Sequence, residues 1–396
     1  MRVILPIGAI LLLAAASLAY ASRRFSLPEP TGPHPVGTRI IYLNEPGRAL
    51  DGTPDPHATR PLVVQLWYPA VPSAAPIANA RRLKETTWRD AYQAAIPTHS
   101  RWNAPVAATP GPLRVLLFSP RWRGERTQNT IAFEELASHG YVIAAVDHPL
   151  NAERMELADG TVIYGSEQLQ GPQGTQATAQ QQISYWNQKL DVWATDMRAT
   201  LDKLSAMNGD PHDPLHARLD TQHVGAWGHS FGGAAALRLC GLDPRVVAAV
   251  NLDGWTFAAL DQRTASQQVM IVYEDVSRLR EQQLQAQPAL QGTEEVMDRE
   301  DFGLTRASLQ RFGGLRLFVE GTQHADFSDQ PILPQIENGK MTGLIAAERS
   351  QQVLRAILLG FFDEALLGKP STLLSPGQKQ FPEVRVERWP VAGLPK

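Results

Sequence analysis

The sequence predicts an α/β fold in which a mostly parallel central sheet is covered by helices on both faces. Two observations support this prediction. Short apolar runs such as 141–146 alternate with longer helix-like stretches such as 178–207. Several of these runs, among them 246–252, are apolar along their whole length, which is typical of strands buried on both faces of a parallel sheet. One domain over residues 25–370 is the simplest organisation.

The composition describes a globular chain with enough apolar residues for a sizeable core. Of its 396 residues, 43% are hydrophobic and 19% are charged, and the formal net charge is −3. A chain without a strongly basic balance is not expected to bind nucleic acid. The sequence has no His-Glu-x-x-His motif and no paired cysteines, so we expect neither a metal site nor a cofactor. Cys240, the single cysteine, cannot form an intramolecular disulfide and is expected to be buried.

Residues 1–24 are expected to stand outside the fold. Arg2 precedes the apolar stretch 3–16, and Ala19-Tyr20-Ala21 offers a cleavage site of the small-x-small type. This pattern predicts export by a signal peptide, to the periplasm or the exterior. The stretch is also nearly long enough to span a bilayer, and the arginines at 23 and 24 could hold it as an uncleaved anchor. Both interpretations remain open, and the proline-rich residues 25–35 are predicted to form an extended lead-in.

The clearest chemical signal is the segment Gly228-His229-Ser230-Phe231-Gly232. It follows the apolar run 223–227 and precedes the helix-forming run 233–239. A serine on a sharp turn from strand to helix is held exposed above the sheet, and small flanking residues permit that strained conformation. Ser230 is therefore the predicted nucleophile. His229, inside the turn, is expected to pack against neighbouring loops.

A serine hydroxyl needs a general base to take its proton, and His324 is the best candidate. The apolar run 315–320 is followed by the loop Gly321–Phe327, which places this histidine just beyond a strand end. Most other histidines lie in proline-rich or polar loop sequence. His148, at the far end of the predicted strand 141–146, is the remaining alternative.

The base needs an acidic group that orients it. Asp253 follows the apolar run 246–252 and is the first choice. Glu274 and Asp275 follow the next apolar run and remain alternatives. The order serine, aspartate, histidine on successive strand ends favours Asp253.

Attack on an ester carbonyl places negative charge on its oxygen, and backbone N–H groups aimed at that oxygen stabilise it. One donor is expected to be the N–H of Phe231. The second is expected from the loop after the apolar run 113–119, where Trp122 is the candidate. Pro120 and Arg121 replace the small-residue His-Gly pattern that is usual here, so the loop is stiffer and carries additional positive charge.

Two polar segments, 151–179 and 276–312, follow predicted strand ends and read as insertions. Loops at the carboxyl ends of parallel strands surround the site in this architecture, so the insertions are expected to shape the acyl and alcohol pockets or to form a lid. Tryptophans 122, 186, 193 and 255 either line an apolar pocket or belong to the core. A closing helix is predicted over 343–367, stopped by Gly368-Lys369-Pro370 and followed by a tail over 371–396.

Six segments in order carry a family resemblance: Thr31–Gly37, the run ending Leu66-Trp67-Tyr68-Pro69, Leu136–His148, the Ser230 turn, Leu252–Trp255 and Gly321–Phe327. Together they resemble the platelet-activating factor acetylhydrolase family, α/β-hydrolases that are also called group VII phospholipases A2. The resemblance implies an α/β-hydrolase fold and a calcium-independent serine esterase that removes short or oxidised acyl groups, such as those at the sn-2 position of phospholipids.

The resemblance also implies the roles of individual residues. It makes Ser230 the nucleophile, Asp253 the acid and His324 the base, with the N–H groups of Phe231 and Trp122 as the oxyanion hole. The expected partner is a small ester or a phospholipid, with contact to a membrane surface left open. Two other functions also stay open, namely a general bacterial carboxylesterase or polyester hydrolase and a non-catalytic binding protein on a hydrolase fold. The sequence does not indicate an oligomeric state.

Overall fold

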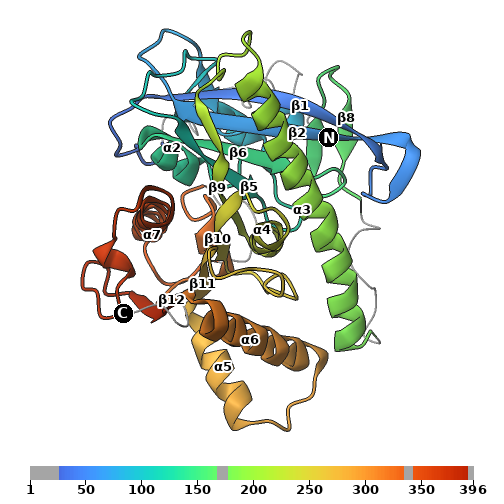
Figure 1. Cartoon of the computed structure of the whole chain (residues 1–396), viewed down its shortest axis with the longest axis vertical. Helices are drawn as coiled ribbons and strands as arrows, with labels where there is room; N and C mark the ends of the chain where they lie inside the picture. The colour runs from blue at the N-terminus through green and yellow to red at the C-terminus, as the bar shows by residue number, and fades with distance from the viewer. Residues whose placement is uncertain (1–25, 167–176, 334–341, 391–396) are drawn as a thin grey trace, which may run out of the picture.

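The computed structural model describes residues 26–166, 177–333 and 342–390. Its centre is an 11-stranded sheet with helices on both sides (Figure 1). From one edge to the other, the strands are β13 (Val384–Trp389), β12 (Gly314–Val319), β11 (Gln268–Glu274), β10 (Val246–Leu252), β9 (Leu219–His229), β5 (Leu113–Ser119), β6 (Tyr141–Asp147), β2 (Pro54–Pro69), β1 (Val36–Arg48), β4 (Pro97–Trp102) and β3 (Ile77–Asn79). A separate pair contains β7 (Arg154–Glu156) and β8 (Val162–Tyr164).

The strands from β12 to β6 all run parallel to one another. The flanking pairs β12–β13, β2–β6 and β1–β2 are antiparallel. The predicted α/β fold with a mostly parallel central sheet is therefore confirmed. The long β1–β2 pair is an addition to the prediction, which included only the end of β2.

Helices bury an apolar layer on each face of the sheet. On one face, α3 (Ala179–Gly209) and α4 (Phe231–Leu242) share a core cluster with Val115 and Leu117 of β5. On the other face, α2 (Thr130–Ser138) and α7 (Ala347–Leu367) share a second cluster with Leu116 and Phe118. Successive side chains of a strand point to opposite faces, so a strand covered on both sides must be apolar throughout.

The ends of two helices follow local sequence signals. Thr178 caps α3 through a reciprocal pair of hydrogen bonds with Gln181. Gly368 ends α7 in the left-handed conformation, with φ 65°. The closing helix ends where it is predicted to end, but it begins at Ala347 rather than 343, because Gly343 N and Ile345 N donate hydrogen bonds to the loop around Gly321 and Asp326.

The described part of the predicted tail, residues 371–390, belongs to the fold. Within it, β13 pairs antiparallel with β12, and Val384 and Val386 are buried in the second core cluster. The predicted signal peptide or anchor over residues 1–24 lies outside the described residues, and export stays a prediction. Among the residues described, we find no helix long and apolar enough to cross a membrane.

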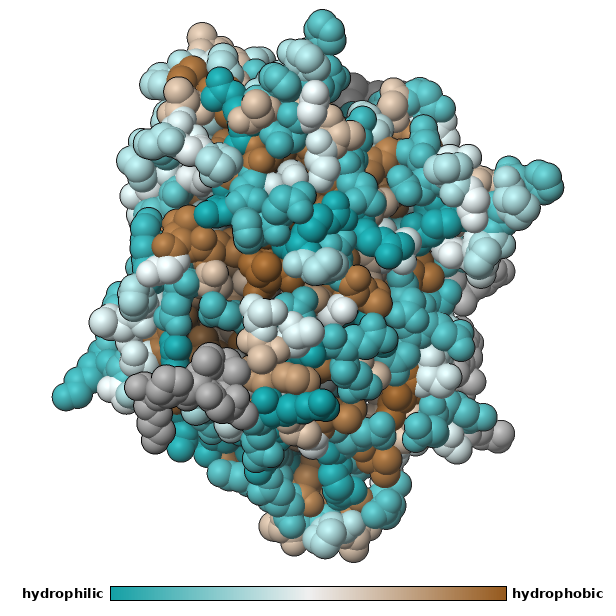
Figure 2. Space-filling view, in the orientation of Figure 1, coloured by the Kyte–Doolittle hydropathy of each residue, from teal (hydrophilic) through white to brown (hydrophobic). Residues whose placement is uncertain are grey.

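The parallel strands end at one edge of the sheet, where the candidate site residues lie. Beyond this edge, α5 (Asp275–Ala286) and α6 (Thr293–Phe312) follow β11 and form the lower part of the molecule in Figure 1. The second predicted insertion, 276–312, therefore forms a pair of helices rather than an irregular loop. Figure 2 shows a surface on which hydrophilic side chains dominate and apolar patches are separated from one another.

Candidate active site

Ser230 lies at the turn between β9 and α4, with φ 56° and ψ −126°. Residues other than glycine rarely adopt this conformation, so surrounding contacts must hold it. Ser230 N donates a 2.7 Å hydrogen bond to Leu252 O at the end of β10, and Gly233 N donates to Ser230 O at 2.9 Å. The strand, sharp turn and helix predicted around this serine are all present.

Close packing explains the glycines on either side of Ser230. A Cβ atom on Gly228 would lie 2.3 Å from the backbone of Gly232. A Cβ atom on Gly232 would lie 2.1 Å from Ser119 O and 2.2 Å from Pro120 O. Only glycine permits these approaches, so the end of β5 and the loop after it pack directly against the first turn of α4.

His324 and Asp253, the predicted base and acid, lie in hydrogen-bonding contact. His324 Nδ1 lies 2.7 Å from Asp253 Oδ2, and Asp253 Oδ1 accepts a 2.9 Å hydrogen bond from Glu274 N. An ionised carboxylate only accepts hydrogen bonds, so Nδ1 carries the proton and Nε2 is free to take another one. Of the alternative acids, Glu274 binds Asp253 through its backbone, and Asp275 Oδ2 accepts a hydrogen bond from Gly321 N at 3.1 Å.

Glu274 adds a second titrating carboxyl group beside this pair. Burial, and then the negative charge of Asp253, raise its pKa to about 7. Its side chain lines the same pocket as Ser230 and His324. Glu274 therefore changes its charge near neutral pH, next to the predicted base.

His229 is a buried residue that packs beside His324. Its buried ring lies 4.5 Å from the His324 ring, and its Nδ1 lies 3.0 Å from Gln128 Nε2, which donates. Burial, and then the charge of His324, lower the pKa of His229. A neutral His229 packed against neighbouring groups agrees with its predicted role.

The alternative base, His148, belongs to a second Ser–His–Asp arrangement. Its Nε2 lies 2.9 Å from Ser119 Oγ and its Nδ1 lies 2.8 Å from Asp196 Oδ2. All three residues are 0% exposed, and burial lowers the pKa of His148 against the effect of Asp196. Because Ser119 is fully buried, this arrangement is part of the core. The sequence contains no local signal for it, because its members come from β5, the end of β6 and α3.

Ser230, Asp253 and His324 line one pocket of about 630 Å³. The helices α5 and α6 supply much of the opposite wall, so the 276–312 insertion lies against the site. The acidic lining residues are Asp253, Glu274, Glu294, Asp298 and Asp301, whereas Arg280 is the one arginine or lysine of the described lining. The pocket therefore presents excess negative charge, together with apolar surface from Val276, Leu279 and Trp255.

The four tryptophans divide between pocket and core. Trp255 lines the pocket, and its Nε1 donates a 2.9 Å hydrogen bond to Asp298. Trp122, Trp186 and Trp193 instead surround Phe231 in an aromatic cluster, with ring centroids 5.3, 5.4 and 4.8 Å from the Phe231 ring. The core interpretation thus holds for three of the four.

The side chains of Phe231 and Trp122, the residues of the predicted oxyanion donors, pack against each other, and neither side chain lines the described pocket. Phe231 is the first residue of α4, and Trp122 lies in the loop that packs against that helix. Among the described residues, no group accepts a hydrogen bond from the Phe231 N–H or the Trp122 N–H.

Comparisons with known proteins find similarity to esterases. Residues 205–367 match the family model described as "Platelet-activating factor acetylhydrolase, isoform II". A protein of Arthroderma benhamiae named "Probable 1-alkyl-2-acetylglycerophosphocholine esterase" is 23% identical, over 94% of this chain and 96% of its own length. The platelet-activating factor acetylhydrolase of Canis lupus familiaris is 22% identical, over 62% of this chain and 57% of its own.

A solved structure shows the same architecture. The ferulic acid esterase from Streptomyces cinnamoneus has a TM-score of 0.71 and 27% identity, covering 91% of this chain and 99% of that one. The fold and these likenesses define an ester hydrolase of the α/β-hydrolase superfamily. Within that superfamily, the chain resembles the platelet-activating factor acetylhydrolase family.

Proposed function

We propose that this esterase removes short or oxidised acyl groups from esters of the acetylated phospholipid type, through an acyl-enzyme on Ser230. The observation that carries the proposal is the His324–Asp253 hydrogen bond beside Ser230 in one pocket. A serine on a strained turn, a base and an orienting carboxylate are the groups that acyl transfer requires.

The reaction follows from these positions. Ser230 Oγ attacks the ester carbonyl while His324 Nε2 takes its proton. The N–H groups of Phe231 and Trp122 donate to the carbonyl oxygen, which becomes negative in the tetrahedral intermediate. His324 then protonates the departing alcohol, and water repeats the sequence to release the acid. Asp253 keeps the proton on Nδ1 and stabilises the imidazolium.

The substrate class is supported by the relatives and by the pocket lining. Two relatives are named for acetylated glycerophospholipid or platelet-activating factor hydrolysis. Apolar surface from Val276, Leu279 and Trp255 suits an acyl or alkyl chain. The excess of carboxylates disfavours a substrate that ends in a carboxylate, so the oxidised acyl groups we propose are uncharged ones.

These three apolar side chains are also exposed, at 49%, 55% and 39%. We propose that they let the pocket mouth contact a lipid surface. Co-sedimentation of the protein with phosphatidylcholine vesicles tests this, and binding should weaken in Leu279→Asp. Equal binding by the parent and this variant would contradict the proposal.

A general carboxylesterase is the second candidate, favoured by the likeness to a ferulic acid esterase over nearly the whole chain. The two are separated by turnover of p-nitrophenyl esters from acetate upward, an sn-2 acetyl phospholipid and methyl ferulate. Activity that falls with acyl length, includes the phospholipid and vanishes in Ser230→Ala and His324→Ala supports the first proposal. Activity on simple or feruloyl esters without the phospholipid supports the second.

A further inference from the structure

We propose that Asn151 is a positioning residue that orients the Trp122 N–H for the oxyanion, an inference that rests on the proposed function. Asn151 lies in the turn after β6, outside the described pocket lining, and is 5% exposed. Its side chain contacts the loop of residues 120–128, which we call the oxyanion loop.

The contacts of Asn151 surround Trp122. Its Oδ1 accepts a 2.8 Å hydrogen bond from Arg123 N, and its Nδ2 donates to Arg121 O at 3.4 Å and to Gly124 O at 3.3 Å. One side-chain amide therefore binds backbone groups both before and after Trp122. Among the described residues, no other side chain hydrogen-bonds to the backbone on both sides of Trp122.

The contact with Arg121 O controls the direction of the Trp122 N–H. Arg121 C=O and Trp122 N–H belong to the same planar peptide group, and in a trans peptide they point in opposite directions. The described chain has no cis peptide bond. Asn151 Nδ2 and Gly124 N, at 2.8 Å, both bind Arg121 O, so they fix the plane of this peptide and direct its N–H away from Asn151.

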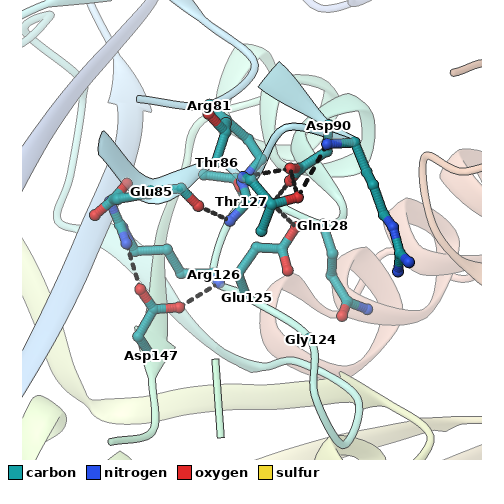
Figure 3. Close-up of polar contacts among 12 residues, drawn as sticks. Arg81, Glu85, Thr86, Asp90, Gly124, Glu125, Arg126, Thr127, Gln128 and Asp147 are labelled. Carbon is teal, nitrogen blue, oxygen red and sulfur yellow. Dashed lines mark hydrogen bonds and ion pairs between the residues drawn. The ribbon is translucent and has the colours of Figure 1, made fainter. Parts of the chain in front are cut away.

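Neighbours of Asn151 hold the two ends of the same loop. At the start of the loop, His148 Nε2 binds Ser119 Oγ at the end of β5. Near its far end, Asp147 accepts a 2.6 Å hydrogen bond from Arg126 N and pairs with the Arg126 guanidinium, which also binds Glu85 (Figure 3). The short segment 147–151 thus anchors the loop at three places, and Asn151 is the anchor nearest the proposed donor.

The Trp122 side chain is held from the same direction. Its ring stacks on Trp193 at 5.5 Å and 13°, and Trp193 stacks on His148 at 3.9 Å and 13°. These ring contacts hold the Trp122 side chain, whereas Asn151 binds the backbone on either side of Trp122. Loss of one oxyanion donor typically lowers kcat by about 100–1000-fold, and a donor that is present but misdirected should lose part of that.

The test compares Asn151→Ala with Asn208→Ala in the full chain. Asn208, near the end of α3, is a matched control because its side chain accepts from Arg218 N and Leu219 N at 2.9 Å and donates to Leu219 O at 3.1 Å. It binds the start of β9, whereas Ser230 follows the end of that strand, roughly 30 Å away. Both changes remove a side chain that binds backbone, but only one of them lies at the oxyanion loop.

We expect Asn151→Ala to lower kcat on p-nitrophenyl acetate by about 10–100-fold while KM changes by less than about threefold. Affinity for a boronic acid, which mimics the tetrahedral intermediate, should fall by a similar factor, and the pH profile should keep its shape because His324 and Asp253 are unchanged. Asn208→Ala should lower Tm and leave kcat unchanged.

Two results would overturn the proposal: a parental kcat in Asn151→Ala, or equal losses of kcat in the Asn151 and Asn208 variants. If Asn151→Ala does not fold, Asn151→Ser serves the same comparison, because its hydroxyl is too short to reach all three backbone groups. The parent protein and Ser230→Ala are measured alongside. Activity that survives in Ser230→Ala would refute the proposed function itself and is thereby distinguished from failure of the Asn151 inference.

Discussion

The described part of the chain holds two Ser–His–Asp sets whose His–Asp hydrogen bonds have nearly the same length, 2.7 Å and 2.8 Å. The first contains Ser230, His324 and Asp253, and the second contains Ser119, His148 and Asp196. His324 retains 31% side-chain exposure at the 630 Å³ pocket, whereas the second arrangement is 0% exposed. The comparison teaches that the residue set alone does not define an active site.

The electrostatic surroundings of the two carboxylates also differ. Asp196 pairs with Arg60 at 2.7 Å and with Arg48 at 2.8 Å. Burial, and to a smaller extent these arginines, lower the pKa of His148. The oxygens of Asp253 instead bind His324 and Glu274 N. An aspartate that already neutralises arginines supports an imidazolium less well.

Removing each serine should give the largest contrast. Ser230→Ala should lower kcat/KM by at least about 10⁴-fold with little change in stability, because only the nucleophile is lost. Ser119→Ala should retain most of the activity but lose about 1–3 kcal/mol of unfolding free energy, since His148 Nε2 is left buried without a partner. Ester turnover and urea denaturation measure the two effects. Equal losses of activity in both variants would contradict the assignment of catalysis to Ser230 and of a structural role to Ser119.

The aspartates should show the same division. Asp253→Asn should lower kcat by about 10³–10⁴-fold, because the base loses its orienting carboxylate. Asp196→Asn should cost about 3–5 kcal/mol of stability by leaving buried Arg60 without its full partner, while the folded fraction stays active. Active-site titration combined with thermal unfolding separates these outcomes. A fully active Asp253→Asn would point to another acid.

Substitution of Glu274 should have a smaller effect, a shift of the pH–rate profile, because Glu274 lies beside His324 and Asp253 at the pocket. Its pKa of about 7 means that it is largely ionised above neutral pH, where its negative charge favours protonated His324. Glu274→Gln removes that charge, so the acid limb of kcat/KM should move to lower pH by roughly 0.5–1 unit. A pH–rate profile measures the shift. A limb that stays in place, or moves to higher pH, would contradict the assigned coupling.

The same raised pKa has a consequence for stability. Between the ordinary value of 4.5 and about 7, the folded protein keeps a proton on Glu274 that the unfolded chain has released. Stability therefore falls as pH rises through this window. Glu274→Gln should reduce that fall in denaturation curves measured across the window.

The smallest effect concerns substrate charge. The open pocket carries excess carboxylates, so a p-nitrophenyl ester with a terminal carboxylate should react more slowly than a neutral ester of equal length. Glu294→Gln removes one of these negative charges, so it should reduce the ratio of the rates for the neutral and the charged ester by about twofold at low salt. The effect is small because an exposed charge is well screened. Comparison of the two esters at low and high salt checks this. A pocket that prefers the carboxylate would contradict the description.

Much of the fold and the site could be predicted from local sequence. The parallel strands are continuous apolar runs, and Ser230 sits on a turn whose glycines are required by contacts of 2.1–2.3 Å. Asp253 and His324 follow strand ends, so parallel packing brings them to the same edge. These features depend on short segments, and each segment carries its own signal.

The remaining features depend on contacts between segments that are distant in sequence. His148 occupies a strand end much as His324 does, and only the packed fold shows that Trp193 and Asp196 of α3 bury it. Asn151 carries no motif, because its partners are backbone groups of another loop. Local sequence does not predict the strand β13 for a related reason, since its short alternating pattern becomes a strand only beside β12.

The central claim is that the exposed arrangement alone reacts, and labelling with a fluorophosphonate tests it most directly. We would incubate the full chain with the probe, map the adduct by peptide mass spectrometry and repeat the labelling with Ser230→Ala and Ser119→Ala. We predict one adduct on Ser230, absent in Ser230→Ala and retained in Ser119→Ala. An adduct on Ser119, or a parent protein that hydrolyses esters without labelling at Ser230, would contradict it.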